Sequence, residues 1–236
     1  MKTIDIYNGQ DPRDIPNYTY PEASRLSGVP QATLRSWVRG RPYPRQDGTA
    51  YFKPIIELPD ADIPALSYNN IIEVHVLSFI RKHHQLELRK VRSAIDFMKK
   101  KWKMTHPLTY QGFKTDGIDL FIEQLGGTIN ASRGGQMVFQ EAIEARLTRI
   151  EYGDDGHSIR LFPFVRNLDS PQQPKIISAD PRVSFGKPVI AGTGIPVTNI
   201  VERLEAGDSI AELADDFQIQ PAQVEEAIRY MLKKAA

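Results

Sequence analysis

The chain has 236 residues and no cysteine, and its 30 lysines and arginines almost balance its 29 aspartates and glutamates. This length accommodates one large domain or two or three smaller ones. The lack of cysteine excludes disulfides, thiolate metal sites and cysteine nucleophiles, and no apolar run is long enough to predict a membrane span. Because the first residues also lack the pattern of a secretory signal, we expect a soluble cytoplasmic protein.

Residues 18–40 have the pattern of two short helices joined by a turn. Thr19 and Glu22 have the spacing of a capping box, which begins the first helix, and Gly28 ends it. In the second helix the apolar residues fall on one side and the opposite side is basic. This arrangement is typical of a helix-turn-helix, whose second helix enters the DNA major groove. A helical hairpin with a solvated arginine face gives the same pattern.

Residues 39–53 favour the DNA-binding interpretation. Cations predominate there, and the sequence DGTAYF indicates a turn that leads into a strand. A hairpin at this point forms a wing whose cations lie along phosphates and supply salt-sensitive affinity. We therefore predict DNA-binding residues in the second helix and the wing, with the arginines of the helix facing the major groove. They are Ala32, Thr33, Arg35, Ser36, Arg39, Arg41, Arg45 and Lys53.

Residues 66–103 predict a long helical region that breaks at His83 and His84. The second of its helices, from about residue 87 to 102, carries most of a local excess of basic residues. A solvated surface explains this excess, and so does a helix that contacts phosphates or supports a dimer.

Residues 107–164 predict a small α+β module. The alternation in IDLFIE after a Thr-Asp-Gly turn predicts a hairpin, and the glycine-rich residues 126–137 predict another strand. A helix is expected from about residue 137 to 150, followed by a returning strand in GHSIRLFPF. Arg133, next to two glycines, is a candidate for an anion-binding nest ahead of that helix, although such glycines also shape ordinary turns.

After a linker at residues 167–175, the C-terminal part combines a turn-rich segment with three short helices. The turn-rich segment is not a phosphate-binding loop, because a proline follows Lys187 and a required glycine is missing. The helices again suggest a helix-turn-helix, but Glu225 and Glu226, expected on the exposed side of the last helix, would be repelled by phosphates. We therefore predict that this unit dimerises or binds a partner; a self-contained stability domain is the alternative.

Two segments resemble known families. Residues 18–40 look like the helix-turn-helix of MerR-type regulators, although the chain lacks the metal-binding cysteines and the long terminal coiled coil of that class. Residues 180–231 resemble a small domain of formerly unknown function found in VapB-type antitoxins, and they contain FGKP, GTGIPV and GDSIAELADDF. Members of that family are typically encoded beside a PIN-like ribonuclease toxin. The resemblance implies an antitoxin that neutralises such a toxin and represses its own operon.

An antitoxin of this kind must cover a nuclease site in which clustered carboxylates hold a divalent cation. A basic side chain inserted there would displace the metal electrostatically. Candidates for contact with the partner are basic residues of loop-like regions together with charged residues of the last helix. They are Arg133, Arg160, Arg182, Glu225, Glu226 and Arg229.

The alternative function is a MerR-like ligand-responsive transcriptional regulator that has no toxin partner and whose α+β module holds a small molecule. Catalysis is not expected, because the histidines lack metal-ligand spacing and no serine lies in a nucleophile elbow.

Together these patterns predict a mostly helical α+β protein. We expect a MerR-like winged helix-turn-helix with a helical extension at residues 1–106, a central α+β module at 107–166, and a trihelical, helix-turn-helix-like domain for dimerisation or toxin binding at 167–236. The expected partners are operator DNA, a PIN-like ribonuclease toxin and a second copy of the chain, with no cofactor, metal or membrane.

Overall fold

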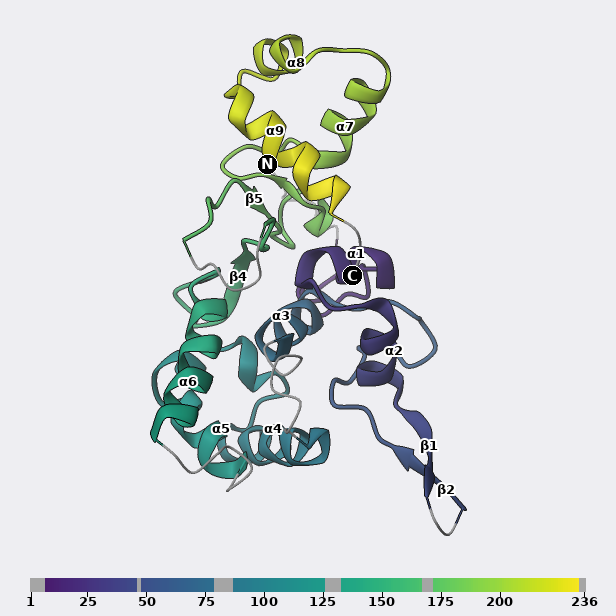
Figure 1. Cartoon of the computed structure of the whole chain (residues 1–236), viewed down its shortest axis with the longest axis vertical. Helices are drawn as coiled ribbons and strands as arrows, with labels where there is room; N and C mark the ends of the chain where they lie inside the picture. The colour runs from purple at the N-terminus through teal and green to yellow at the C-terminus, as the bar shows by residue number, and fades with distance from the viewer. Residues whose placement is uncertain (1–6, 46–47, 79–86, 126–132, 167–171, 234–236) are drawn as a thin grey trace.

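The computed structural model describes residues 7–45, 48–78, 87–125, 133–166 and 172–233. Within these residues, helices are combined with three two-stranded antiparallel sheets, which confirms the α+β class. The molecule is elongated, with the C-terminal helices at one end and the hairpin of residues 41–52 projecting from the other (Figure 1). Buried apolar residues from its different parts form one connected core.

The chain begins its regular structure with two short helices, α1 (Tyr20–Ser27) and α2 (Gln31–Arg39). The predicted capping box is present, because Thr19 and Glu22 exchange hydrogen bonds between side chain and backbone. Gly28 ends α1 in the left-handed conformation, with a φ of 71°. The apolar side of α2 is buried as predicted, through Leu34, Trp37 and Val38.

An antiparallel hairpin follows α2, with Arg41 opposite Phe52 across β1 (Arg41–Arg45) and β2 (Gly48–Phe52). The expected strand is therefore confirmed, whereas residues 46 and 47 of the expected turn lie outside the described residues. Gly40, with a φ of 71°, joins α2 to β1, and a Cβ there would lie 2.2 Å from the Phe52 carbonyl oxygen. Glycine is required where the chain leaves the helix so close to β2.

Two longer helices, α3 (Tyr68–Leu77) and α4 (Leu88–Trp102), occupy the predicted helical region. Every residue of α3 is buried, and this helix packs against both α1 and α6 (Arg133–Leu147). A helix that is buried on every side belongs in the centre of a protein, and polar side chains of α3 such as Asn70 and Glu73 hydrogen-bond to each other there. The expected break at His83 and His84 lies outside the described residues.

The central segment forms helices where strands were expected. Short helical turns, η2 (Pro107–Thr109) and η3 (Phe113–Gly117), lead into α5 (Ile118–Leu125). The hairpin predicted around IDLFIE is therefore wrong. The segment forms a helix instead because Ile118, Phe121 and Leu125 recur at helical spacing and bury one face of α5.

The predicted strand at residues 126–137 is also wrong where it can be compared, since residues 133–137 form the start of α6. Arg133 and its glycines lie in the first turn of this helix, so the nest expected ahead of the helix is not formed there. Burial of Ile143 and Leu147 anchors α6, which offsets the weak helix propensity of glycine. The expected returning strand is confirmed: β4 (Ser158–Leu161) pairs with β3 (Ile150–Tyr152).

The C-terminal unit contains the three expected helices, and its turn-rich segment also contains a small sheet that the sequence did not predict. The sheet pairs β5 (Ile177–Ser178) with β6 (Val189–Ile190), and η5 (Ser184–Gly186) lies between these strands. The helices are α7 (Val197–Glu205), α8 (Ile210–Asp216) and α9 (Pro221–Leu232). Helix α9 packs on both of the others. No helix within the described ranges has both the length and the apolar character needed to cross a bilayer.

Candidate nucleic-acid interface

Two exposed arginines on α2 share one tyrosine of α1. Arg35 and Arg39 lie one helical turn apart. The guanidinium carbon of Arg35 is 5.3 Å from the centroid of the Tyr20 ring, and Arg39 Nε donates to the Tyr20 hydroxyl at 3.2 Å. Both arginines remain exposed. Tyr20 therefore contacts each guanidinium group on one side and leaves the other side accessible to solvent or to a ligand.

The remaining predicted DNA-binding residues lie on α2 and at the base of the hairpin. Ala32 is exposed, and Thr33 and Ser36 are half-buried. Arg41 opens β1 and Lys53 follows β2, and both are exposed. Arg45 is the last residue of β1, and its side chain lies outside the described structure. The predicted residues of α2 and the cations at the hairpin base therefore lie on elements that follow each other directly in the chain.

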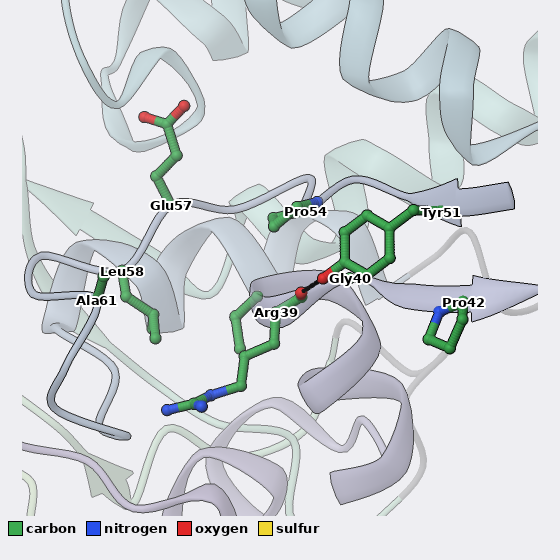
Figure 2. Close-up of a pocket in the computed structure, with 9 residues that line it drawn as sticks. Arg39, Gly40, Pro42, Tyr51, Pro54, Glu57, Leu58 and Ala61 are labelled. Atoms are coloured by element: carbon green, nitrogen blue, oxygen red, sulfur yellow. Dashed lines mark hydrogen bonds between the residues drawn. The ribbon is translucent and has the colours of Figure 1, made fainter.

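A groove of about 600 Å³ separates the end of α2 and the hairpin from the segment that follows (Figure 2). In it, the Tyr51 hydroxyl donates to the carbonyl oxygen of Arg39, as the dashed line in Figure 2 marks. This bond ties β2 to the last turn of α2. The groove is lined by Val38, Arg39, Gly40, Pro42, Tyr51, Pro54, Glu57, Leu58 and Ala61.

Helix α4 is connected to the base of the hairpin. Arg92 Nη1 donates to the Lys53 carbonyl oxygen at 2.9 Å, and its guanidinium carbon lies 5.8 Å from the Phe52 ring centroid. Sequence patterns do not point to Tyr20, Tyr51 or Arg92. Their contacts join separate elements, and no local sequence pattern signals such contacts.

The predicted partner-binding arginines have different surroundings. Arg160 lies in β4 rather than in a loop, which corrects that expectation, and it pairs with Glu151 at 2.9 Å and Asp180 at 3.3 Å. Arg182 is exposed, and its backbone N–H donates to Asp180 Oδ1 at 2.9 Å. Arg133 opens α6, but its side chain is not described. Arg160 and Arg182 therefore both contact Asp180, one through its side chain and the other through its backbone, whereas Arg133 lies on a different element.

The expectation that Glu226 lies on the exposed side of α9 is wrong. This residue is 1% exposed, and Oε2 accepts from Arg166 at 3.1 Å and also from Arg229. Glu226 precedes the buried Tyr230 by four residues, so the two share a face of α9. Glu225 and Arg229 are exposed, as expected.

The C-terminal unit contacts the start of α1. Lys187 Nζ lies 2.6 Å from Glu22 Oε1, and the Tyr18 hydroxyl donates to the Gly186 carbonyl oxygen at 2.9 Å. Asn17 donates through its side chain to the carbonyl oxygen of Phe185. The FGKP segment, residues 185–188, thus contacts the start of α1 and holds the C-terminal unit against the helix pair that carries the candidate interface.

A buried histidine contributes to packing between α3 and the segment after β4. Burial, reinforced by the positive charge of Arg146, lowers the pKa of His75 to about 3. His75 stacks on Phe164 with ring centroids 5.5 Å apart, and its Nε2 is 3.1 Å from the Arg146 carbonyl oxygen. No cluster of three histidine or carboxylate side chains suited to a metal ion occurs among the residues that the structure describes.

Comparison with known proteins identifies the family. A Mycobacterium tuberculosis protein named "Putative antitoxin VapB45" is 32% identical over 234 residues, which cover 91% of this chain and 93% of that protein. The chain belongs to the VapB45-like family of antitoxin-like proteins. Residues 177–231 also match the family described as "Protein of unknown function (DUF433)".

Two further proteins of the same organism are similar along most of the chain. "Uncharacterized protein Rv2308" is 22% identical over 223 residues, covering 92% of this chain and 90% of its own. The crystal structure of Rv2018 superimposes with a TM-score of 0.64 at 26% identity, and the match covers 91% of this chain and 98% of Rv2018. The VapB45 relative and the matched C-terminal family support the antitoxin-like character expected from the C-terminal motifs, and the fold is shared with the Rv2018 crystal structure.

Proposed function

We propose that the protein is the antitoxin of a toxin–antitoxin pair and that it binds operator DNA through α2 and the β1–β2 hairpin. The observation that carries the DNA-binding part is the placement of Arg35 and Arg39 on Tyr20. Two solvent-facing guanidinium groups are thereby held one turn apart on the second helix of a helix-turn-helix-like pair. Arginine is the side chain that most often contacts guanine in the major groove.

In this proposal α2 enters the major groove and the hairpin follows the backbone as the wing of a MerR-like winged helix-turn-helix. Arg35, Ser36 and Arg39, with Ala32 and Thr33 on the same helix, face base edges. Arg41 and Lys53 contact phosphates at the hairpin base, and Arg45 does so further along β1. Phosphate contacts release counterions, so affinity falls as the salt concentration rises.

Toxin binding is assigned to the units that follow the DNA-binding unit of residues 1–106. The VapB45 relative carries the word antitoxin in its name, which supports a toxin partner. Exposed Arg182, Glu225 and Arg229 are the favoured contacts in the unit of residues 167–236. Arg133 and Arg160, in the unit of residues 107–166, are secondary, because Arg160 is already paired with two carboxylates.

The proposed partner is a PIN-like ribonuclease whose carboxylate cluster holds a divalent cation. A cationic side chain covering that cluster would inhibit it without any catalysis by the antitoxin. Repression of the operon follows if a homodimer of the chain places two α2 helices in successive major grooves of a palindromic operator. These roles place the protein in the cytoplasm, without a cofactor.

The DNA-binding part is tested with the Arg35→Ala/Arg39→Ala double variant. The readout is fluorescence anisotropy on the DNA upstream of the protein's own gene, at two salt concentrations. We expect wild type to bind, and the variant to lose at least about 100-fold in affinity, since two base contacts are removed. The matched control is Lys175→Ala/Arg182→Ala, which removes two exposed cations from the C-terminal part and should bind within about threefold of wild type. Equal losses in both variants would contradict the assigned surface.

A further inference from the structure

The structure assigns to Tyr20 a further role, which rests on the proposed function: it is a positioning residue that orients Arg35 and Arg39 for base recognition. Its ring face lies under one guanidinium group and its hydroxyl binds the other. One side chain of α1 therefore restrains two side chains of α2 by two different interactions.

The Tyr20 side chain begins from a fixed backbone. It is the first residue of α1, directly after the Thr19 cap. Tyr18, two positions earlier, exchanges backbone hydrogen bonds with Leu66, at 2.9 Å and 2.8 Å. Because a tyrosine has only two side-chain torsions, an anchored backbone leaves its ring little freedom. The ring is therefore a suitable support for arginines, which lose substantial rotamer entropy when a ligand fixes them.

The hydrogen bond to Tyr20 also selects which edge of Arg39 is available. Arg39 Nε is occupied by the tyrosine hydroxyl, and no hydrogen bond from its two Nη nitrogens is formed within the described residues. The free edge is the terminal pair of Nη groups, a fork of donors that matches two neighbouring acceptors. In the major groove, guanine presents such a pair at O6 and N7, whereas adenine presents an acceptor beside a donor. The chemistry that Tyr20 favours at this position is therefore a guanine edge.

Loss of a side chain that positions the arginines should affect DNA binding differently from loss of a positive charge. Removing the tyrosine leaves both arginine charges in place, so attraction to phosphates is unchanged. What changes is the share of conformations that present the guanidinium groups to a base edge. Affinity for the operator should fall, while affinity for unrelated DNA and the salt dependence should stay the same.

The experiment compares Tyr20→Phe, which removes only the Arg39 hydrogen bond, with Tyr20→Leu, which also removes the stack under Arg35. Each variant is titrated with the DNA upstream of the gene and with a scrambled fragment of equal length. We expect the ratio of the two affinities to fall roughly threefold to tenfold for Tyr20→Phe and further for Tyr20→Leu. The control is Phe97→Leu, which removes another exposed aromatic ring that stacks with a cation, Lys101, at 5.9 Å, and should leave the ratio unchanged.

A second readout needs no DNA. In wild type, the Nε–Hε resonance of Arg39 should show slow solvent exchange and that of Arg35 a ring-current shift. Tyr20→Phe should remove the first effect alone, and Tyr20→Leu should remove both. An unchanged affinity ratio in both variants would overturn the inference, as would an equal loss for operator and scrambled DNA. Wild type that binds neither fragment would instead contradict the proposed function, which separates the two failures.

Discussion

Lys187 Nζ lies 2.6 Å from Glu22 Oε1, across 165 positions of sequence. The same glutamate closes the capping box of α1. Partial burial acts to raise the pKa of the Glu22 carboxyl, but hydrogen bonds from Lys187 and Thr19 outweigh it and hold the pKa below its ordinary value. The start of the proposed DNA-binding unit and the FGKP segment of the C-terminal unit therefore share one carboxylate.

The close approach at this contact predicts that Gly186→Ala is strongly destabilising. Gly186 has a φ of 76°, and a Cβ there would lie 2.2 Å from the Tyr18 hydroxyl oxygen. We expect a loss of roughly 2–4 kcal/mol in the free energy of unfolding, from backbone strain together with the clash. Urea denaturation measures it.

The matched control is Gly192→Ala. Gly192 has a similar φ of 80°, but nothing lies within 4 Å of a Cβ there. Its expected loss is only about 1 kcal/mol, the cost of the left-handed backbone. If the two variants lost the same stability, the contact between Gly186 and Tyr18 would contribute nothing measurable.

The pH dependence of stability should reflect His106. Burial favours its neutral form, but the hydrogen bond and charge of Glu73, with the charge of Asp14, outweigh this and raise the pKa of His106 above its ordinary value. A raised pKa in the folded state stabilises the fold fully below the unfolded pKa, and this stabilisation is lost as the pH rises through the folded pKa. Wild type should therefore exceed His106→Gln in stability most at about pH 5.5 and least at about pH 9.

Urea denaturation of both proteins across this range measures the difference. His75 is present in both, so its own pH dependence cancels. A difference that stayed constant with pH, or that grew as the pH rose, would contradict the assignment to the His106–Glu73 pair.

Replacing Arg149 by lysine should destabilise the fold even though the positive charge is preserved. It is buried, and its guanidinium donates to backbone carbonyl oxygens of two segments, residues 162–163 and residues 173–174. The acceptors are those of Phe162, Pro163, Gln173 and Pro174, at 3.0, 3.3, 2.6 and 3.2 Å. A lysine cannot reach all of them, so Arg149→Lys should cost roughly 2–4 kcal/mol.

Thermal or urea unfolding checks this value against Arg182→Lys. The side chain of Arg182 is exposed, and that substitution should change stability by no more than about 0.5 kcal/mol. Similar effects of the two substitutions would show that the carbonyl contacts of Arg149 are not what stabilises this region.

The parts of the fold that depend on neighbouring residues could be predicted from sequence. The helix start predicted at Thr19 from the glutamate three positions later is formed, and Ser209 and Glu212, which have the same spacing, form the same capping box. The helices of the C-terminal unit and the hairpin after α2 also lie where their local patterns place them. In each case the signal is a hydrogen bond or a turn that needs only nearby residues.

The predictions from sequence fail where contacts with an element distant in the sequence determine the local structure or the burial of a side chain. Residues 118–123 contain apolar side chains at both strand and helix spacings. The close packing of Trp102 from α4, whose ring would lie 2.6 Å from a Cβ at Gly117, shows how tightly this segment meets α4. Glu226 was expected to be exposed, but Arg166 reaches it from another segment. In the candidate site, Arg35 and Arg39 could be predicted from one helix, whereas Tyr20 could not, because it lies on another.

The central claim, that this chain is an antitoxin, is tested most directly by co-expressing the tagged protein with the protein encoded beside its gene. The measurement is the ribonuclease activity of the purified material before and after the tagged protein is removed by denaturation and the partner is refolded. The proposal predicts a stable complex with little activity, activity that returns when the partner is alone, and an intact complex for Arg35→Ala/Arg39→Ala. If no complex formed while DNA binding persisted, the antitoxin function would be contradicted and a ligand-responsive regulator would take its place.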